Sequence, residues 1–242
     1  MTQIASPQNP RLKALRKLAA RRERARSGRF LAEGEDLVAA AERAGFEAVE
    51  GFRLAGTGLG GEGFHDVQPG ALAAASTLGS ASRVIGVYEQ RWAAPAGPLC
   101  VYLHGVSDPG NVGTIVRSAQ AFGASSVALG PRCADPWSPK AVRASMGAIF
   151  AVPLARVSAV DELPGERVAL LAGAREILRH AEGGRPVSLL VGSERDGLPA
   201  DVIAACERSA RIPISSESLN AAMAATVALY EMTRGPSRVT AS

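Results

Sequence analysis

Three short segments of the chain combine glycine with polar side chains that could bind or activate a substrate. They span residues 108–117 (DPGNVGTIVR), 190–198 (LVGSERDGL) and 211–220 (RIPISSESLN). In the first, Asp-Pro-Gly is typical of a turn, and Asn111 can cap the helix that follows. Arg117 then lies within the first two turns of that helix, where the N-terminus already favours anions, so we expect Arg117 to contact a phosphate.

The second and third segments add a carboxylate and further capping groups. Gly192 would let a ligand approach the backbone closely, and Glu194 places a carboxylate at the edge of a sheet. Ser218 or Asn220 can cap a last helix, whose side chains over residues 220–229 (NAAMAATVAL) are so small that it must pack closely on the sheet or on a second subunit. Each segment taken alone also fits an ordinary turn and helix cap.

The elements that position these segments indicate an α/β fold. Short apolar runs recur in the second part of the chain, with helical or loop stretches between them, at residues 99–103, 127–129, 168–171, 187–191 and 210–214. Continuous apolar runs are typical of strands buried on both faces, which predicts a mostly parallel sheet with helices on each side. Ligands bind at the carboxyl ends of such strands, and all three polar segments lie there.

The first part of the chain has a different pattern. Asn9 and Pro10 suit the start of a helix that we expect to run to about Ser27, and a second helix is expected over residues 35–44. Residues 90–98 (QRWAAPAGP) have no periodicity and two prolines, as linkers do. We therefore predict a domain over residues 1–92, a linker over 93–98 and a second domain over 99–242.

Charge and composition limit the classes of protein. The first 30 residues hold nine Lys and Arg and one acid, whereas the whole chain has a net charge of +4. This concentration fits a nucleic-acid-binding surface, and on composition alone it fits a solvated helix face equally well. Three cysteines without a C-x-x-C pair and three scattered histidines indicate neither a disulfide framework nor a metal site. No apolar run is long enough for a membrane span, so we expect a cytoplasmic protein.

Together, the polar segments resemble the three motifs of the SpoU (TrmH) family of RNA ribose methyltransferases. The resemblance rests on Asn111-x-Gly113-x-x-x-Arg117, on Gly192-Ser193-Glu194-x-x-Gly197-Leu198, and on Ile212-Pro213 followed by Ser218-Leu219-Asn220 and Tyr230-Glu231. Residues 143–148 (RASMGA) resemble an intervening family signature. The motifs occur in order within about 145 residues, and residues 1–92 more loosely resemble the family's L30e-like substrate-binding domain.

The resemblance implies a fold, a cofactor and a partner. The C-terminal domain would be an α/β knot, in which a parallel sheet with helices on both faces is threaded as a deep trefoil. S-adenosylmethionine would bind in the knot without any metal, and the protein would form a homodimer through this domain. The implied cofactor contacts are Leu171, Gly192, Ile212 and Leu219. The loop of residues 215–217 (SSE) looks shorter than that of many relatives, which could alter how the cofactor is held.

The resemblance also implies an activity, the 2′-O-methylation of a ribose in RNA. Arg117 would act as a phosphate contact or as the base, with Asn111, Glu194, Ser218 and Asn220 orienting it and the ribose. The extra N-terminal domain favours 23S rRNA over tRNA, in a housekeeping or an antibiotic-resistance role; a tRNA methyltransferase of the family and an inactive RNA-binding module are the alternatives. RNA contacts are expected from Arg11, Lys13, Arg16, Lys17, Arg21, Arg22 and Arg143.

Overall fold

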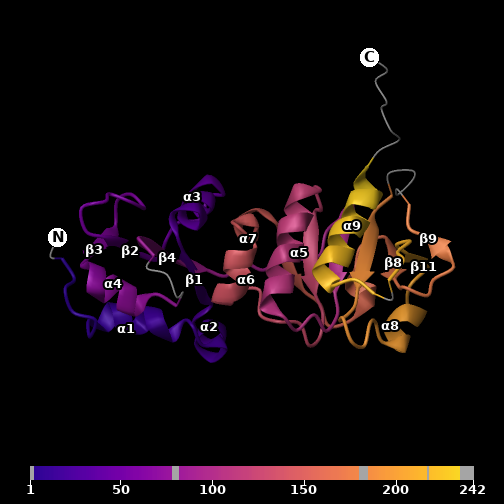
Figure 1. The fold of residues 1–242 in the computed structure, drawn as a ribbon, viewed down its shortest axis with the longest axis horizontal. Helices are drawn as coiled ribbons and strands as arrows, with labels where there is room; N and C mark the ends of the chain where they lie inside the picture. The colour runs from indigo at the N-terminus through magenta and orange to yellow at the C-terminus, as the bar shows by residue number, and fades with distance from the viewer. Residues whose placement is uncertain (1–2, 78–81, 180–184, 217, 235–242) are drawn as a thin grey trace, which may run out of the picture. The chain divides into compact units, whose positions relative to one another are not determined.

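A computed structural model of the chain describes residues 3–77, 82–179, 185–216 and 218–234. The chain divides into two compact units (Figure 1), Met1–Arg91 with Asp135–Ala151, and Trp92–Ala134 with Val152–Ser242. The structure thus differs from the predicted boundaries in placing residues 135–151 with the first unit. The reason is aromatic packing, since the Phe30 ring lies 4.6 Å from that of Trp137 and 5.7 Å from that of Phe150. The continuous domains 1–92 and 99–242 stay a prediction.

The first unit is built on a four-stranded mixed sheet of order β1-β4-β2-β3. Strand β4 is antiparallel to both of its neighbours, and β3 is parallel to β2. The strands are β1 (Arg29–Glu33), β2 (Glu50–Leu54), β3 (Phe64–Val67) and β4 (Val84–Glu89). The helices of this unit are α1 (Pro10–Lys17), α2 (Arg21–Ser27), α3 (Glu35–Arg43), α4 (Pro69–Ala75), α6 (Pro139–Ala144) and α7 (Ala148–Ala151).

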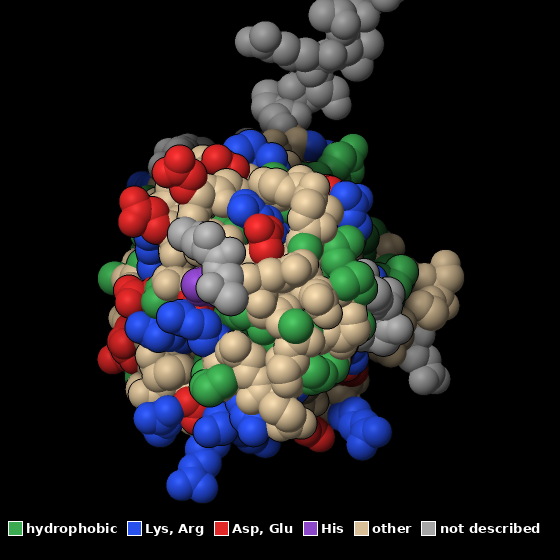
Figure 2. Space-filling view, turned by 90° about the vertical axis from the view of Figure 1, so that its left-hand side faces the viewer, with side chains coloured by type: hydrophobic (Ala, Val, Ile, Leu, Met, Phe, Trp, Pro, Cys, Tyr) green, Lys and Arg blue, Asp and Glu red, His purple; other side chains and the backbone are tan. Residues whose placement is uncertain are grey.

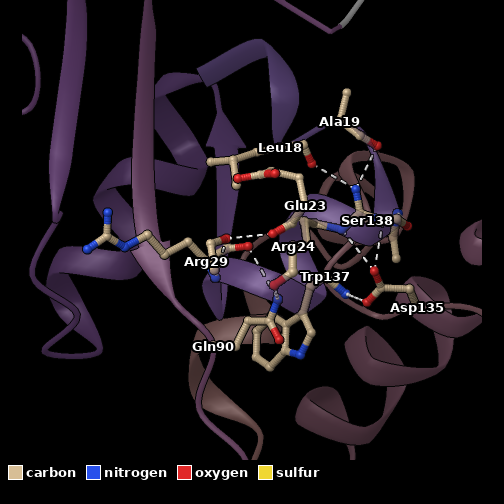
Figure 3. A network of polar contacts seen from close by, with 11 residues as sticks. Leu18, Ala19, Glu23, Arg24, Arg29, Gln90, Asp135, Trp137 and Ser138 are labelled. Atoms are coloured by element: carbon tan, nitrogen blue, oxygen red, sulfur yellow. Dashed lines mark hydrogen bonds and ion pairs between the residues drawn. The ribbon is translucent and has the colours of Figure 1, made fainter. Parts of the chain in front are cut away.

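The predicted first helix is wrong in one respect, because it breaks into α1 and α2 between Lys17 and Arg21. The break is fixed by Arg24, whose side chain is only 3% exposed and whose polar contacts are drawn in Figure 3. Its guanidinium donates hydrogen bonds to the carbonyl oxygens of Leu18 and Ala19, which follow α1, and forms an ion pair with Asp135 at 2.8 Å. Arg24 is therefore a structural residue and is not available to RNA.

The second unit contains a seven-stranded sheet of order β7-β6-β5-β10-β8-β11-β9, and all its strand pairs are parallel. The predicted parallel sheet is confirmed. The knot is a finer statement about how the chain is threaded, and it stays a prediction. The strands are β5 (Leu99–Leu103), β6 (Ser126–Leu129), β7 (Leu154–Arg156), β8 (Glu166–Leu170), β9 (Glu176–Ile177), β10 (Val187–Val191) and β11 (Arg208–Arg211).

Helices pack against this sheet and position the polar segments. Helix α5 (Pro109–Ala121) lies beside α9 (Ala221–Thr233) (Figure 1), and the hydroxyls of Ser118 and Thr226 join the two helices at 2.6 Å. Helix α8 (Ala200–Ala204) packs through Val202 into the cluster that includes Tyr102. Among the helices of the described residues, none is long and apolar enough to cross a membrane.

Candidate active site

Polar side chains from three chain segments meet at the carboxyl end of the second unit's sheet. Asn111 belongs to the first turn of α5, Glu194 follows β10, and Asn220 directly precedes α9. The side-chain amide of Asn111 donates a hydrogen bond to Glu194, and that of Asn220 donates to Glu194 at 3.0 Å and to the Asn111 oxygen at 3.3 Å. Residues separated by up to 109 positions thus form one hydrogen-bonded group.

The group depends on how the two helices are capped. From the sequence we expected Asn111 to cap α5, but the carboxylate of Asp108 caps this helix by accepting a hydrogen bond from the Asn111 backbone amide. The side chain of Asn111 is therefore free to reach Glu194. Asn220 does both tasks, because its oxygen accepts from the backbone of Ala222 while its nitrogen donates to Glu194. Of the two residues predicted to cap α9, Ser218 and Asn220, the structure has Asn220 as the cap.

A cavity of about 200 Å³ opens next to this group, and its walls are mainly apolar. All four residues predicted to contact the cofactor line it, as does Ser218, a predicted site residue. Glu194 and Ser193 bring polar atoms to the wall. The full lining is Leu170, Leu171, Ala172, Val191, Gly192, Ser193, Glu194, Gly197, Ile212, Ile214, Ser218, Leu219, Ala221 and Ala224.

The structure explains the glycine at position 192 differently from the sequence, which suggested close approach of a ligand to the backbone. A Cβ atom at this position would lie 2.2 Å from the backbone carbon of Gly197. The loop after β10 folds back here, with Ser193 and Gly197 exchanging backbone hydrogen bonds at 3.2 and 3.1 Å. Gly192 is therefore required by the close packing of this loop, which in turn positions Glu194.

Arg117 stands apart from the hydrogen-bonded group. It lies on the exposed side of α5, and within the described part of the chain its side chain has no hydrogen-bond or ion-pair partner. It follows Asn111 by six residues, which places the two side chains about 120° apart around the helix.

Ser218 is exposed at the cavity and is likewise not hydrogen-bonded to Glu194 among the described residues. The chain as described thus assembles three of the five predicted site residues.

The residues predicted to bind RNA lie in the first unit, and their surroundings differ. Lys and Arg side chains gather along the lower edge of the molecule in Figure 2, the side on which α1 and α2 lie. Arg11 forms an ion pair with Glu50 at 2.5 Å, and Arg16 donates to the carbonyl oxygen of Ala74 at 3.4 Å. Exposed residues without such contacts in the described chain are Lys13, Lys17, Arg21 and Arg22, while Arg143 is exposed on α6.

The chain from residue 98 to residue 230 matches the family that its motifs resemble. The SpoU rRNA Methylase family model matches residues 98–230, and a model described as the MRM3-like substrate binding domain matches residues 9–60. An uncharacterized tRNA/rRNA methyltransferase of Synechocystis is 31% identical over 96% of this chain and 93% of its own.

Two further relatives cover almost all of this chain. The 23S rRNA (guanosine(2553)-2′-O)-methyltransferase of Bacillus subtilis is 29% identical over 96% of this chain and 99% of its own length. The crystal structure of an AdoMet-bound rRNA methyltransferase from Sinorhizobium meliloti is 32% identical, covers 95% of this chain and 96% of that one, and superposes with a TM-score of 0.84. The predicted family is thus confirmed, and the chain belongs to the SpoU rRNA methylase family of RNA methyltransferases.

Proposed function

We propose that this protein transfers a methyl group from S-adenosylmethionine to the 2′-oxygen of a ribose in RNA, with 23S rRNA as the substrate. The observation that carries the proposal is the group of Asn111, Glu194 and Asn220 beside an apolar cavity at the carboxyl edge of the sheet. The relatives named for rRNA methylation support an rRNA substrate. A cytoplasmic location follows from such a substrate.

The cavity fits S-adenosylmethionine in its chemistry. Leu171, Ile212 and Leu219 offer apolar surface to an adenine ring, and backbone groups of the strand ends offer hydrogen bonds to its polar edge. The carboxylate of Glu194 at the wall favours a ligand that carries positive charge. When bound, this cofactor supplies an electrophilic methyl group with a good leaving group, so the reaction requires no metal.

The residues of the chain must align a ribose and help to remove its 2′-proton. Asn111 and Asn220 fix the Glu194 carboxylate through the hydrogen bonds described above, which leaves an oriented acceptor for a ribose hydroxyl. Holding the two reacting atoms in line contributes several kcal/mol, of the order of 7–11 in ideal cases. Ser218 at the cavity adds a second hydroxyl-binding group.

Arg117 binds the phosphate of the target nucleotide in this proposal. A normal arginine stays protonated, which makes it a poor base and a good phosphate ligand. Its exposure and its freedom from other partners in the described chain support this role. The phosphate that it holds can then assist removal of the ribose proton.

A homodimer through the second unit completes the proposal. Helix α9 exposes Met223 (59%), Val227 (37%) and Tyr230 (51%), which are spaced four and three residues apart and so form one apolar stripe. Arg117 lies on the exposed side of the neighbouring helix α5. A second copy on this surface would bury the stripe and lie close to Arg117.

We expect the substitution Val227→Glu to convert this dimer to a monomer at micromolar concentration, because it buries a carboxylate in an apolar contact. Light scattering after size-exclusion chromatography measures the mass. The matched control is Val49→Glu in the first unit, at a valine that is 41% exposed, and this variant should remain dimeric. A parent protein that is monomeric at these concentrations would refute the dimer.

The basic surface of α1 and α2 should bind the RNA backbone. Replacing Lys13, Lys17, Arg21 and Arg22 by Gln should flatten the dependence of log affinity on log salt by roughly 0.7–0.9 for each phosphate that is no longer neutralised. Substitution is preferable to deletion because Leu12 and Leu15 of α1 are buried. The control variant replaces Arg11 and Arg26, whose charges are already paired with Glu50 and Glu23. An unchanged slope in the fourfold variant would exclude this surface from RNA binding.

The decisive experiment incubates the protein with labelled S-adenosylmethionine and separated rRNA and tRNA, and then maps the 2′-O-methylated position. Label in 23S rRNA supports the proposal, whereas label in tRNA alone favours the tRNA methyltransferase. Binding of RNA without binding of the cofactor in calorimetry would indicate the inactive RNA-binding module. Whether the role is housekeeping or antibiotic resistance depends on the nucleotide that is mapped.

A further inference from the structure

The turn that follows β6 holds an arginine in a conformation that arginine rarely adopts. Arg132 has a φ of +60°, and Met146 is the other non-glycine residue with positive φ in the described chain. Pro131 followed by a positive φ is typical of a type II turn, in which Gly or Asn normally takes the place of Arg132. A side chain kept at such a position despite its conformational cost indicates that the guanidinium has a role of its own.

This turn is fastened to the segment that leads from β5 into the candidate active site. The Gly130 amide donates to the Leu103 carbonyl at 2.9 Å, and the Gly105 amide donates to the Pro131 carbonyl at 3.0 Å. The Ala134 amide donates to the Val106 carbonyl at 2.9 Å. Arg132 is thus exposed on a rigid support, not on a loose loop.

A buried histidine holds the Arg132 side chain. His104 is 7% exposed, and its Nε2 lies 3.5 Å from the Arg132 guanidinium while its Nδ1 lies 2.9 Å from the Tyr102 hydroxyl. Because a guanidinium can only donate, Nε2 accepts, and Nδ1 must carry the hydrogen and donate to Tyr102. Burial and the charge of Arg132 lower the pKa of His104, which agrees with a neutral ring.

The position of Arg132 in the sheet places it near the site where the RNA is expected to bind. In the sheet, β5 lies between β6 and β10, so the turn after β6 and the cofactor cavity beside β10 lie on opposite sides of β5. Neighbouring strands are about 4.8 Å apart, which puts the ends of β6 and β10 roughly 10 Å from each other. Within the described chain Arg132 has no acidic partner, so its charge is available to a ligand.

We propose that Arg132 binds a phosphate of the RNA next to the target ribose and that His104 acts as its positioning residue. This inference rests on the proposed RNA substrate and adds a phosphate contact on the far side of β5 from the cofactor. The anion is a phosphodiester of the substrate RNA.

The variant Arg132→Asn separates this role from a structural one, since asparagine adopts the left-handed conformation more readily than arginine. Its melting temperature should equal or exceed that of the parent. Its affinity for a 23S rRNA transcript should fall roughly five- to tenfold at 0.1 M salt, and the slope of log affinity against log salt should decrease by about 0.7–0.9. Arg132→Lys should keep the slope, and cofactor affinity should not change in either variant.

The control Arg175→Asn removes an exposed arginine next to β9, which is an edge strand of the same sheet far from β6, and should leave the slope unchanged. His104→Leu should weaken RNA binding to a similar degree as Arg132→Asn, and the double variant should be no weaker than either. His104→Gln, which retains an acceptor, should restore part of the affinity. An unchanged affinity and slope in Arg132→Asn would overturn the inference. The binding measurement does not depend on methyl transfer. A failure of the proposed function would appear in the methylation assay, so it can be told apart from a failure of this inference.

Discussion

Replacing Arg117 by alanine should lower the rate of methyl transfer by at least about 10²–10³-fold, the size of effect seen when one oriented charge-stabilising donor is removed from an active site. Cofactor affinity should stay the same, because Arg117 does not line the cavity in which we place S-adenosylmethionine. Single-turnover transfer from labelled cofactor measures the first quantity, and calorimetry measures the second.

Arg117→Lys distinguishes the two roles considered for this residue. Lysine retains the charge but loses the bidentate fork, so a phosphate contact predicts partial activity with a raised KM. A lysine titrates at a lower pH than an arginine, so a base at this position would make the rate rise with pH in the lysine variant. Arg175→Ala serves as the control for removing an exposed arginine from the same unit. Full activity in Arg117→Ala would remove Arg117 from the mechanism.

Replacing Arg24 by methionine should destabilise the first unit by about 3–5 kcal/mol, because it leaves the Asp135 carboxylate largely buried without its partner. The substitution also leaves the carbonyl oxygens of Leu18 and Ala19 without their donor. Urea unfolding followed by the fluorescence of Trp137, in a protein whose other tryptophan is changed by Trp92→Phe, reports on this unit. The control Arg26→Met removes an arginine that is 72% exposed, and its effect should stay below about 1 kcal/mol.

A second substitution tests whether the buried charge of Asp135 causes the destabilisation expected in Arg24→Met. Asp135→Asn removes that charge and keeps an oxygen that can accept the hydrogen bond from the Trp137 amide. The double variant Arg24→Met with Asp135→Asn should therefore be more stable than Arg24→Met alone. If the two destabilising effects simply add, the ion pair is not what stabilises this junction.

The sheet of the second unit was predictable because its strands carry a strong local signal. Residues 99–103 are a continuous apolar run and residues 187–191 are apolar except for Ser188, and the structure has β5 and β10 over the same residues. The strand predicted at residues 210–214 matches the structure less closely. Strand β11 ends at Arg211, because Ile212 and Ile214 leave the sheet to line the cavity.

The break in the first helix could not be predicted from nearby residues. In sequence, Arg24 is one of nine cations in a basic stretch, and its position among arginines suggests a surface charge. Its partner Asp135 lies 111 residues further along the chain. Burial of this one arginine is a property of the tertiary contact, so no local pattern distinguishes it from its neighbours.

Three of the five predicted site residues, Asn111, Glu194 and Asn220, form one hydrogen-bonded group, but their arrangement could not be predicted from the sequence. Asp108 and Asn111 are both good capping residues, and the local sequence does not decide between them. The choice depends on Glu194, which is 83 residues from Asn111 and gives the Asn111 side chain a better partner than its own helix. The loop predicted to be short includes residue 217, which lies outside the described residues.

The assignment of residues 135–151 to the first unit has a consequence for how such proteins can be recombined. The chain passes between the two units at residues 91–92, 134–135 and 151–152, so neither unit is a single continuous stretch of sequence. A fusion that exchanges only residues 1–91 for those of a relative would remove Phe30 and Arg24 from Trp137 and Asp135. Transplanting the first unit, which we propose to bind RNA, therefore requires that residues 1–91 and 135–151 be moved together.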